Sequence, residues 1–188
     1  VPEPKQAILR SVHKLPSNTS HLQVNHKQYL INRGFDPEKL VKGWSLRGTG
    51  PASILDGVDY GRRILAPILW ENRTVSFQCR DVTGRHRLKY MACPKKRELI
   101  EHQTVLYGRQ DRWKDIGICV EGITDVWRLG FQSFGVFGID YTPAQLREMV
   151  KAFKRIVIVF DDDPQAVQQA RRLQKQLTYR GVSASVEE

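Results

Sequence analysis

The sequence predicts an α/β protein in which a parallel sheet flanked by helices follows a smaller α+β subdomain with an antiparallel meander. Two observations carry this prediction. From residue 116 onward, short apolar runs alternate with helical patterns, and this β-α-β-α-β-α-β order is typical of a parallel sheet covered by helices on both faces. Between residues 64 and 91, three strand-like segments follow one another with short turns between them, which favours antiparallel pairing.

The first part of the chain divides into an arm, two helices and a loop. Residues 1–20 are rich in proline and end in a polar run, so we expect a linker or a loosely held arm. A helix is predicted over 21–32, with its apolar side chains facing inward. Asp36 followed by Pro37 is the pattern of a helix cap and a first helical residue, and it predicts a second short helix. The glycine-rich residues 45–61 are expected to be loop.

The middle of the chain has the period of strands. Residues 64–70 form an apolar strand candidate, in which Pro67 favours an edge position or a bulge. Residues 74–82 follow a short turn and alternate apolar with polar side chains, and residues 85–91 return as the third strand. These three segments make up the predicted meander.

The last part of the chain alternates strands and helices. Strands are predicted at 116–120, 134–139, 156–160 and 182–186. Helices are predicted at 124–129, after the cap Thr142-Pro143, and at 164–179. We therefore expect residues 21–110 to form a basic N-terminal subdomain and residues 111–188 to form the sheet subdomain.

Positive charge is concentrated in the first part of the chain. The 188 residues carry a formal net charge of +10 and have a pI near 9.7. Residues 1–110 hold 19 Lys and Arg against 9 Asp and Glu, a net charge of +10, whereas residues 111–188 hold 11 of each, a net charge of zero. Basic surfaces attract polyanions because they neutralise phosphates and release counterions. Nucleic acid is the expected partner, and a solubilising charge excess stays the alternative.

Composition argues against several other classes of protein. No apolar run approaches the roughly 20 residues that cross a bilayer, no signal peptide opens the chain and no basic amphipathic helix stands out, so no membrane partner is expected. The three cysteines lack the paired spacing of a disulfide framework or a zinc site and indicate a reduced, cytoplasmic setting. Because the chain opens with Val1 rather than Met, the presence of flanking domains is left open.

Carboxylates follow two of the predicted strands directly. Glu121 and Asp125 come after one strand, and Asp161 and Asp163 come after the most apolar one. Because functional groups of an open parallel sheet gather beyond the carboxyl ends of its strands, we expect these acids to lie together. Alternate residues of an extended chain point the same way, so Asp161 and Asp163 can reach one ion. Oxygen ligands of this kind suit Mg²⁺ or Mn²⁺ rather than zinc or copper.

Helix capping is the structural alternative for these acids. Asp and Asn at a helix start accept backbone hydrogen bonds and interact favourably with the helix dipole. This reading suits Asp162 and Asp163 best, because Pro164 follows them. Two acid clusters on two strand ends favour the metal site for the group as a whole.

The pattern Glu121-Gly-x-x-Asp125 with Asp161-x-Asp163 at strand ends resembles the Toprim fold, which bacterial-type primases, topoisomerases and several nucleases share. The resemblance implies that Glu121, Asp161 and Asp163 bind Mg²⁺ or Mn²⁺ and that Asp125 supports the site. All four are therefore the predicted catalytic residues.

Upstream segments are similar, in their order, to the RNA polymerase domain of DnaG-type primases of bacteria and phage. These segments are residues 29–35, 63–68, 76–81, 89–94 and 106–108. The resemblance covers roughly residues 22–188. Gln78 and Cys79 depart from it, since the family usually has small residues at these positions.

A basic stretch lies within this resemblance. Residues 80–97 hold seven Lys and Arg against a single acid. We expect the stretch to face the acidic sheet edge and to follow a template backbone or bind a nucleoside triphosphate. Arg80, Lys89, Arg85 and Arg87 are the predicted binding residues, and the resemblance points to the first two in particular. For each of them taken alone, a solvated surface charge is the alternative.

The resemblance implies the catalytic core of a DNA primase, which makes short RNA primers on single-stranded DNA by metal-dependent nucleotidyl transfer. The expected partners are a single-stranded DNA template, ribonucleoside triphosphates and, through flanking domains, a replicative helicase. Two rivals stay open: a Toprim nuclease, and a catalytically degenerate nucleic-acid-binding module of a mobile-element or phage replication protein. A topoisomerase is disfavoured, because this length leaves no room for a companion domain with a catalytic tyrosine.

Overall fold

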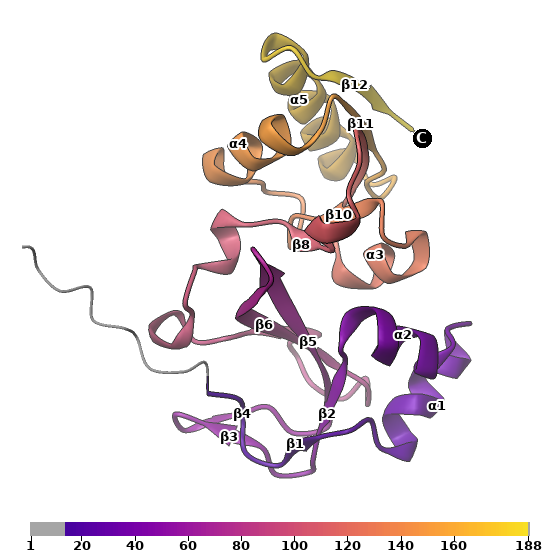
Figure 1. Cartoon of the computed structure of the whole chain (residues 1–188). Helices are drawn as coiled ribbons and strands as arrows, with labels where there is room; N and C mark the ends of the chain where they lie inside the picture. Colours follow the sequence, from indigo (N-terminus) through magenta and orange to yellow (C-terminus); the bar gives the residue numbers. More distant parts are fainter. Residues whose placement is uncertain (1–13, 188) are drawn as a thin grey trace, which may run out of the picture.

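The computed structural model describes residues 14–187 and contains two main sheets (Figure 1). The part coloured indigo to magenta, at the bottom of Figure 1, holds an antiparallel sheet, and the orange-to-yellow part at the top holds a mostly parallel sheet with helices around it. The predicted class, a helix-flanked sheet preceded by an α+β part, is confirmed. Within the described residues, every helix is too short or too polar to span a membrane.

The antiparallel sheet has the strand order β1-β2-β5-β6-β7. Its strands are β1 (Thr19–Ser20), β2 (Arg47–Thr49), β5 (Arg63–Trp70), β6 (Arg73–Asp81) and β7 (Tyr90–Ala92). Helices α1 (Val24–Asn32) and α2 (Pro37–Trp44) lie between β1 and β2 in the chain, and Asp36 caps α2 by accepting from the N–H groups of Glu38 and Lys39. Because β5, β6 and β7 are consecutive antiparallel neighbours, the predicted meander is confirmed.

Short strands account for most of the differences from the prediction. Thr19 and Ser20 pair with β2, so the end of the expected arm belongs to the sheet, while residues 1–13 lie outside the described residues. The expected loop 45–61 contains β2 and a small hairpin of β3 (Ile54–Leu55) and β4 (Val58–Asp59). Strands of two or three residues are too short for an alternating pattern to show in the sequence. The third strand of the meander was expected at 85–91, but in the structure it is the shorter β7, Tyr90–Ala92.

Pro67 does not lie on an edge strand, because β5 runs between β2 and β6. β2 pairs with Ile64 and Leu65 and ends before Pro67, so Pro67 has a strand partner on the β6 side alone. The register of β5 against β6 shifts between Ile68 and Leu69, just after the proline. The bulge was therefore predicted close to its place, and the edge position was wrong.

The second sheet has the strand order β12-β11-β9-β10-β8, in which β8 alone runs antiparallel to its neighbour. Its strands are β8 (Tyr107–Gly108), β9 (Ile116–Val120), β10 (Ser133–Gly135), β11 (Arg155–Ile158) and β12 (Ser183–Val186). The helices between them are α3 (Ile123–Leu129), α4 (Pro143–Ala152) and α5 (Pro164–Tyr179). Right-handed crossovers place α4 and α5 on one face and α3 on the other (Figure 1). The boundary expected between residues 110 and 111 falls between β8 and β9 of this same sheet. Three short 3₁₀ helices lie before β9, at Lys95–Arg97, His102–Thr104 and Gln110–Arg112.

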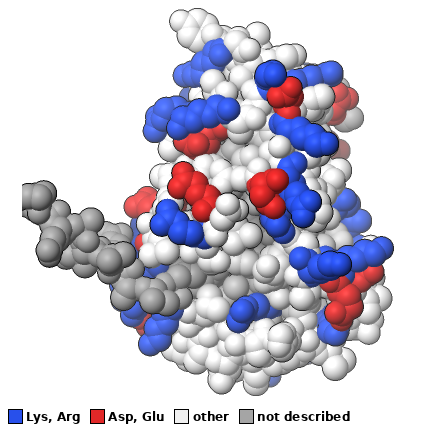
Figure 2. Space-filling view, in the orientation of Figure 1, with Lys and Arg blue, Asp and Glu red and all other residues white. Residues whose placement is uncertain are grey.

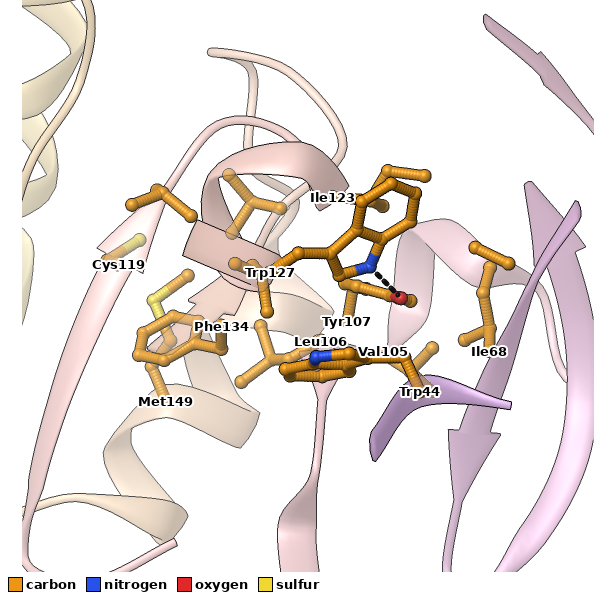
Figure 3. Close-up of a cluster of buried hydrophobic side chains, with 14 of the residues drawn as sticks. Trp44, Ile68, Val105, Leu106, Tyr107, Cys119, Ile123, Trp127, Phe134 and Met149 are labelled. Atoms are coloured by element: carbon orange, nitrogen blue, oxygen red, sulfur yellow. Dashed lines mark hydrogen bonds between the residues drawn. The ribbon is translucent and has the colours of Figure 1, made fainter. Parts of the chain in front are cut away.

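One hydrophobic core joins the two sheets (Figure 3). Trp44 of the first part stacks on Tyr107 of the second with ring centroids 5.8 Å apart. The indole Nε1 of Trp127, on α3, donates to the buried hydroxyl of Tyr107 at 2.7 Å. Because these aromatic side chains are fully or nearly fully buried, the two sheets pack as one folded unit.

Candidate functional site

The predicted acids lie at the point where the sheet connections change direction. β9 and β11 are neighbours, but α3 leads from β9 to β10 on one side and α5 leads from β11 to β12 on the other. Such a switch point opens a crevice beyond the carboxyl ends of the two strands. Glu121 directly follows β9, and Asp161 follows β11. Glu121 Oε1 accepts a hydrogen bond from the backbone N–H of Asp161 at 2.8 Å, so these two strand ends meet as expected.

A pocket of about 420 Å³ opens at this place, between the two sheets. Glu121, Asp125 and Asp161 line its acidic side. The remaining lining comes from both parts of the chain: Arg33, Gln78, Tyr90, Gly122, Thr124, Phe137 and Gly138. The acids therefore face a wall that the antiparallel part supplies.

Two carboxylates of this pocket, those of Glu121 and Asp125, have raised pKa values. Burial raises the pKa of Glu121, and the negative charges of Asp161, Asp163 and Asp125 raise it further. Burial likewise raises the pKa of Asp125, with an added contribution from the charge of Asp161, while Arg33 acts in the opposite direction. Carboxylates that raise one another's pKa in this way gain most from a cation placed among them.

Gly122 makes room for Asp125. A Cβ atom at residue 122 would lie 2.9 Å from Oδ2 of Asp125, closer than such contacts occur. The chain turns here from β9 into α3, which brings Asp125, in the first turn of the helix, back toward the acidic edge. Thr124, next to it, shares a hydrogen bond of 3.1 Å between its Oγ1 and the Tyr90 hydroxyl, which joins the two sides of the pocket.

Asp163 has a structural contact of its own. Its Oδ1 accepts from the N–H groups of Gln165 and Ala166, at 3.0 Å each, and so caps α5. Asp162 lines a different pocket of about 260 Å³, beside β12. The structure thus brings Glu121, Asp125 and Asp161 into one pocket, and places Asp163 close by as a helix cap whose charge still acts on Glu121.

Arg80 lies in the wall behind Tyr90. Its Nε donates to the Tyr29 hydroxyl at 2.9 Å, and its guanidinium lies 4.6 Å from the centre of the Tyr90 ring. Arg80 thereby connects α1, β6 and β7 and orients Tyr90 against the pocket.

The other predicted basic residues lie in the loop between β6 and β7. Arg85, Arg87 and Lys89 are exposed there, and none of the three lines the acidic pocket. Arg33, at the end of α1, supplies the cationic side chain of the pocket instead. Lys and Arg are spread over both parts of the molecule on the face shown in Figure 2, with acidic side chains among them at mid-height, at the upper right and at the lower right.

The side chains that line the pocket include oxygen ligands of the kind that hard divalent cations prefer. Its three acids offer only carboxylate oxygens, which Mg²⁺ and Mn²⁺ prefer. Burial and the neighbouring negative charges raise the pKa values of Glu121 and Asp125. Across residues 14–187, however, no three His, Cys, Asp or Glu side chains stand together closely enough to hold a metal ion as they are. One oxygen of Glu121 is directed at the Asp161 N–H, so a bound ion would need these side chains to turn.

Four of the residues that line the pocket were not predicted as site residues from the sequence. Arg33 and Tyr90 lie inside the segments 29–35 and 89–94, so their order along the chain was the available signal. Gln78 was noted only as a departure from a pattern. Phe137 carries no signal, because its place depends on a φ of 67°, which bulky residues rarely adopt.

Several solved structures that share this fold are primase catalytic domains. The chain is 22% identical to the Aquifex aeolicus primase with its zinc-binding and RNA polymerase domains, at a TM-score of 0.74 over 87% of this chain and 49% of that one. It is 19% identical to the E. coli primase catalytic core, at a TM-score of 0.72 over 86% of this chain and 64% of that one. It is 18% identical to a DnaG primase catalytic domain bound to single-stranded DNA, at a TM-score of 0.70 over 82% of this chain and 59% of that one.

These likenesses establish that the chain has the fold of DnaG primase catalytic cores, as the resemblance predicted. The chain spans between 49% and 64% of the length of the three proteins. No family model and no curated protein matches the sequence.

Proposed function

We propose that the chain is the catalytic core of a DNA primase, with a Toprim-type acidic edge, that joins ribonucleotides on a single-stranded DNA template. The observation that carries this proposal is the meeting of Glu121 and Asp161 at the sheet switch point, opposite a wall that contains Arg33 and Tyr90. The primase fold supports it, since carboxylates at this edge combined with a basic partner surface suit phosphoryl transfer.

Glu121, Asp161 and Asp125 are the side chains that would hold Mg²⁺ or Mn²⁺, with Asp163 nearby. When bound, these ions supply charge neutralisation at the attacking and leaving oxygens of a phosphoryl transfer. Their binding would also relieve the repulsion that, after burial, raises the pKa values of Glu121 and Asp125.

The remaining pocket residues position the reactants. Arg33 places a cation in the same pocket as the acids, where a phosphate can bind it. Arg80 holds Tyr90, and Tyr90 is tied to Thr124 on the acidic side, so the distance between the two walls is fixed. Arg85, Arg87 and Lys89 extend the basic surface along the loop before β7, where they can bind a template backbone.

A primer-synthesis assay tests the proposal. The chain is incubated with single-stranded DNA, four ribonucleoside triphosphates and Mg²⁺ or Mn²⁺, and we expect short RNA products. Asp161→Asn removes the charge of an exposed pocket acid and is expected to abolish the products without unfolding the protein. Asp115→Asn, a surface acid paired with Lys154, is the matched control and should leave them unchanged.

Two other results separate the rivals. Cleavage of the DNA without any polymer would replace the proposal with a Toprim nuclease. DNA binding that persists in a chelator, with neither synthesis nor cleavage, would indicate a degenerate binding module of a mobile-element or phage replication protein. The proposed partners are the template and the ribonucleotides, the proposed setting is the cytoplasm, and the helicase interaction stays a prediction.

A further inference from the structure

Gln78 is a buried polar side chain without a partner. It is 9% exposed, and its amide makes no hydrogen bond to any residue between 14 and 187. An amide that has no protein partner and lines a pocket can hydrogen-bond to water or to a ligand. Gln78 lines the acidic pocket, so its amide faces the space that a ligand would occupy.

The neighbours of Gln78 on β6 do not share this feature. Ser76 and Arg80 point to the same face of the strand, since alternate residues of a strand do so. Ser76 Oγ donates to Glu98 at 2.6 Å, and Arg80 Nε donates to the Tyr29 hydroxyl at 2.9 Å. Of these three polar side chains, Gln78 alone has no hydrogen-bond partner among the described residues, so its donor and its acceptor are available to a ligand.

The surroundings of Gln78 suit a flat, partly apolar ligand. The rings of Tyr90 and Phe137 line the same pocket, and aromatic side chains are common partners of nucleobases. The same pocket is lined by Arg33 and by the three acids, which suit phosphates and their cations. A nucleotide can therefore place its base near Gln78 and its phosphates near the acidic edge.

We infer that the pocket contains a nucleobase subsite in which the Gln78 amide reads the base of the bound ribonucleotide and favours adenine. This inference rests on the proposed function, because a templated nucleotide uses its Watson–Crick edge for pairing and leaves only the opposite edge to the protein. That edge offers a donor beside an acceptor in adenine, two acceptors in guanine, and a single polar group in cytosine or uracil. An amide, which presents one donor and one acceptor, matches adenine.

Binding of ATP and of 7-deaza-ATP tests the inference. The two ligands pair identically with a template, but the second lacks N7, the acceptor that the Gln78 amide would use. With a single-stranded DNA that contains the complementary base and with Mn²⁺ present, we expect the protein to bind ATP roughly tenfold more tightly than 7-deaza-ATP. Gln78→Met keeps the length of the side chain, removes the amide and should bring the two affinities together.

Gln168→Met, an exposed position on α5, is the matched control and should keep the preference. Thermal unfolding of both variants shows that each is folded. Equal binding of the two ligands by the unmodified protein, no binding of either, or a preference that survives Gln78→Met would overturn the inference. If the protein makes no primers but shows the preference and loses it with Gln78→Met, the primase proposal fails and the base subsite stands.

Discussion

Oε1 of Glu121 lies 2.8 Å from the backbone nitrogen of Asp161, although the two residues are 40 positions apart in the chain. The hydrogen bond ties the end of β9 to the end of β11. The Glu121 carboxylate thus lies against the backbone of Asp161, and the negative charges of the two side chains repel each other.

Glu121→Gln is expected to separate activity from stability. The amide keeps an oxygen that can accept from the Asp161 N–H, but it removes one of the repelling charges. We expect primer synthesis to fall by at least about a hundredfold, while the midpoint of thermal unfolding stays the same or rises by about 2–4 °C, the equivalent of roughly 1 kcal/mol. Glu148→Gln, on the surface of α4, should change neither quantity, and full activity of Glu121→Gln would remove Glu121 from the site.

Divalent cations should stabilise the protein, and more so at higher pH. The pKa values of Glu121 and Asp125 are raised in the folded protein, so the stability that these groups contribute is fully present below their ordinary pKa and is lost as the pH rises through the raised one. A cation among the carboxylates removes this loss. We expect Mn²⁺ to raise the unfolding midpoint clearly at about pH 8 and little at about pH 4. An equal rise for Glu121→Gln would show that the ion binds elsewhere.

Arg80 is expected to act on nucleic-acid binding through Tyr90 as well as through its charge. Arg80→Lys keeps the charge but loses the planar group that lies over the Tyr90 ring and the Nε–H that bonds Tyr29. We expect this variant to bind single-stranded DNA more weakly by a few-fold, with an unchanged dependence on salt. Arg87→Ala, in the exposed loop, should instead lower the slope of log K against log salt by about 0.7, the value for one phosphate contact on a single strand. Unchanged binding by Arg80→Lys would mean that Arg80 contributes charge alone.

His26 makes folding sensitive to mild acid. It is fully buried, its Nδ1 accepts from the backbone N–H of Gln23 and its Nε2 has no partner among the described residues. Burial lowers its pKa from 6.5 to about 4, so the unfolded chain binds the proton first and stability falls as the pH drops from about 6.5 to about 4. We expect a loss of about 3 kcal/mol over this range in urea titrations, and a smaller loss for His26→Gln. His21→Gln, at an exposed position, should leave the pH profile unchanged.

Tyr107→Phe should weaken the fold without touching the acidic pocket. It removes the acceptor of the Trp127 indole and leaves a buried N–H without a partner. The expected cost in the free energy of unfolding is about 1–3 kcal/mol, measured by urea denaturation. Activity per folded molecule should be preserved, and a loss of activity at full stability would place Tyr107 in the site itself.

The sequence predicted those parts of the molecule whose signals are local and strong. The helix after Asp36 and the helix after Asp163 begin at their caps. The apolar run before Asp161 contains the strand Arg155–Ile158, in which Ile156 and Ile158 are buried. The meeting of Glu121 and Asp161 followed from the rule on strand ends.

The parts that the sequence left unpredicted depend on tertiary contacts. β1, β3 and β4 have two residues each, so only their pairing identifies them. The position of Asp163 in the sequence does not show whether it caps a helix or acts near Glu121, because both roles place an acid at the start of a helix. Arg33 and Gln78 reach the pocket only because the antiparallel part packs against α3, which no pattern along the chain encodes.

The shared aromatic core has a consequence for how reactants arrive. Contacts among Trp44, Tyr107 and Trp127 hold the two sheets together, and a hydrogen bond joins Tyr90 and Thr124 in the lining of the pocket. A hinge motion that separates the two sheets would therefore break the hydrophobic core that they share. The width of the pocket is therefore set when the chain folds, before the template and the nucleotide bind. The entropic cost of bringing its two sides together arises once, during folding, and does not recur at each turnover.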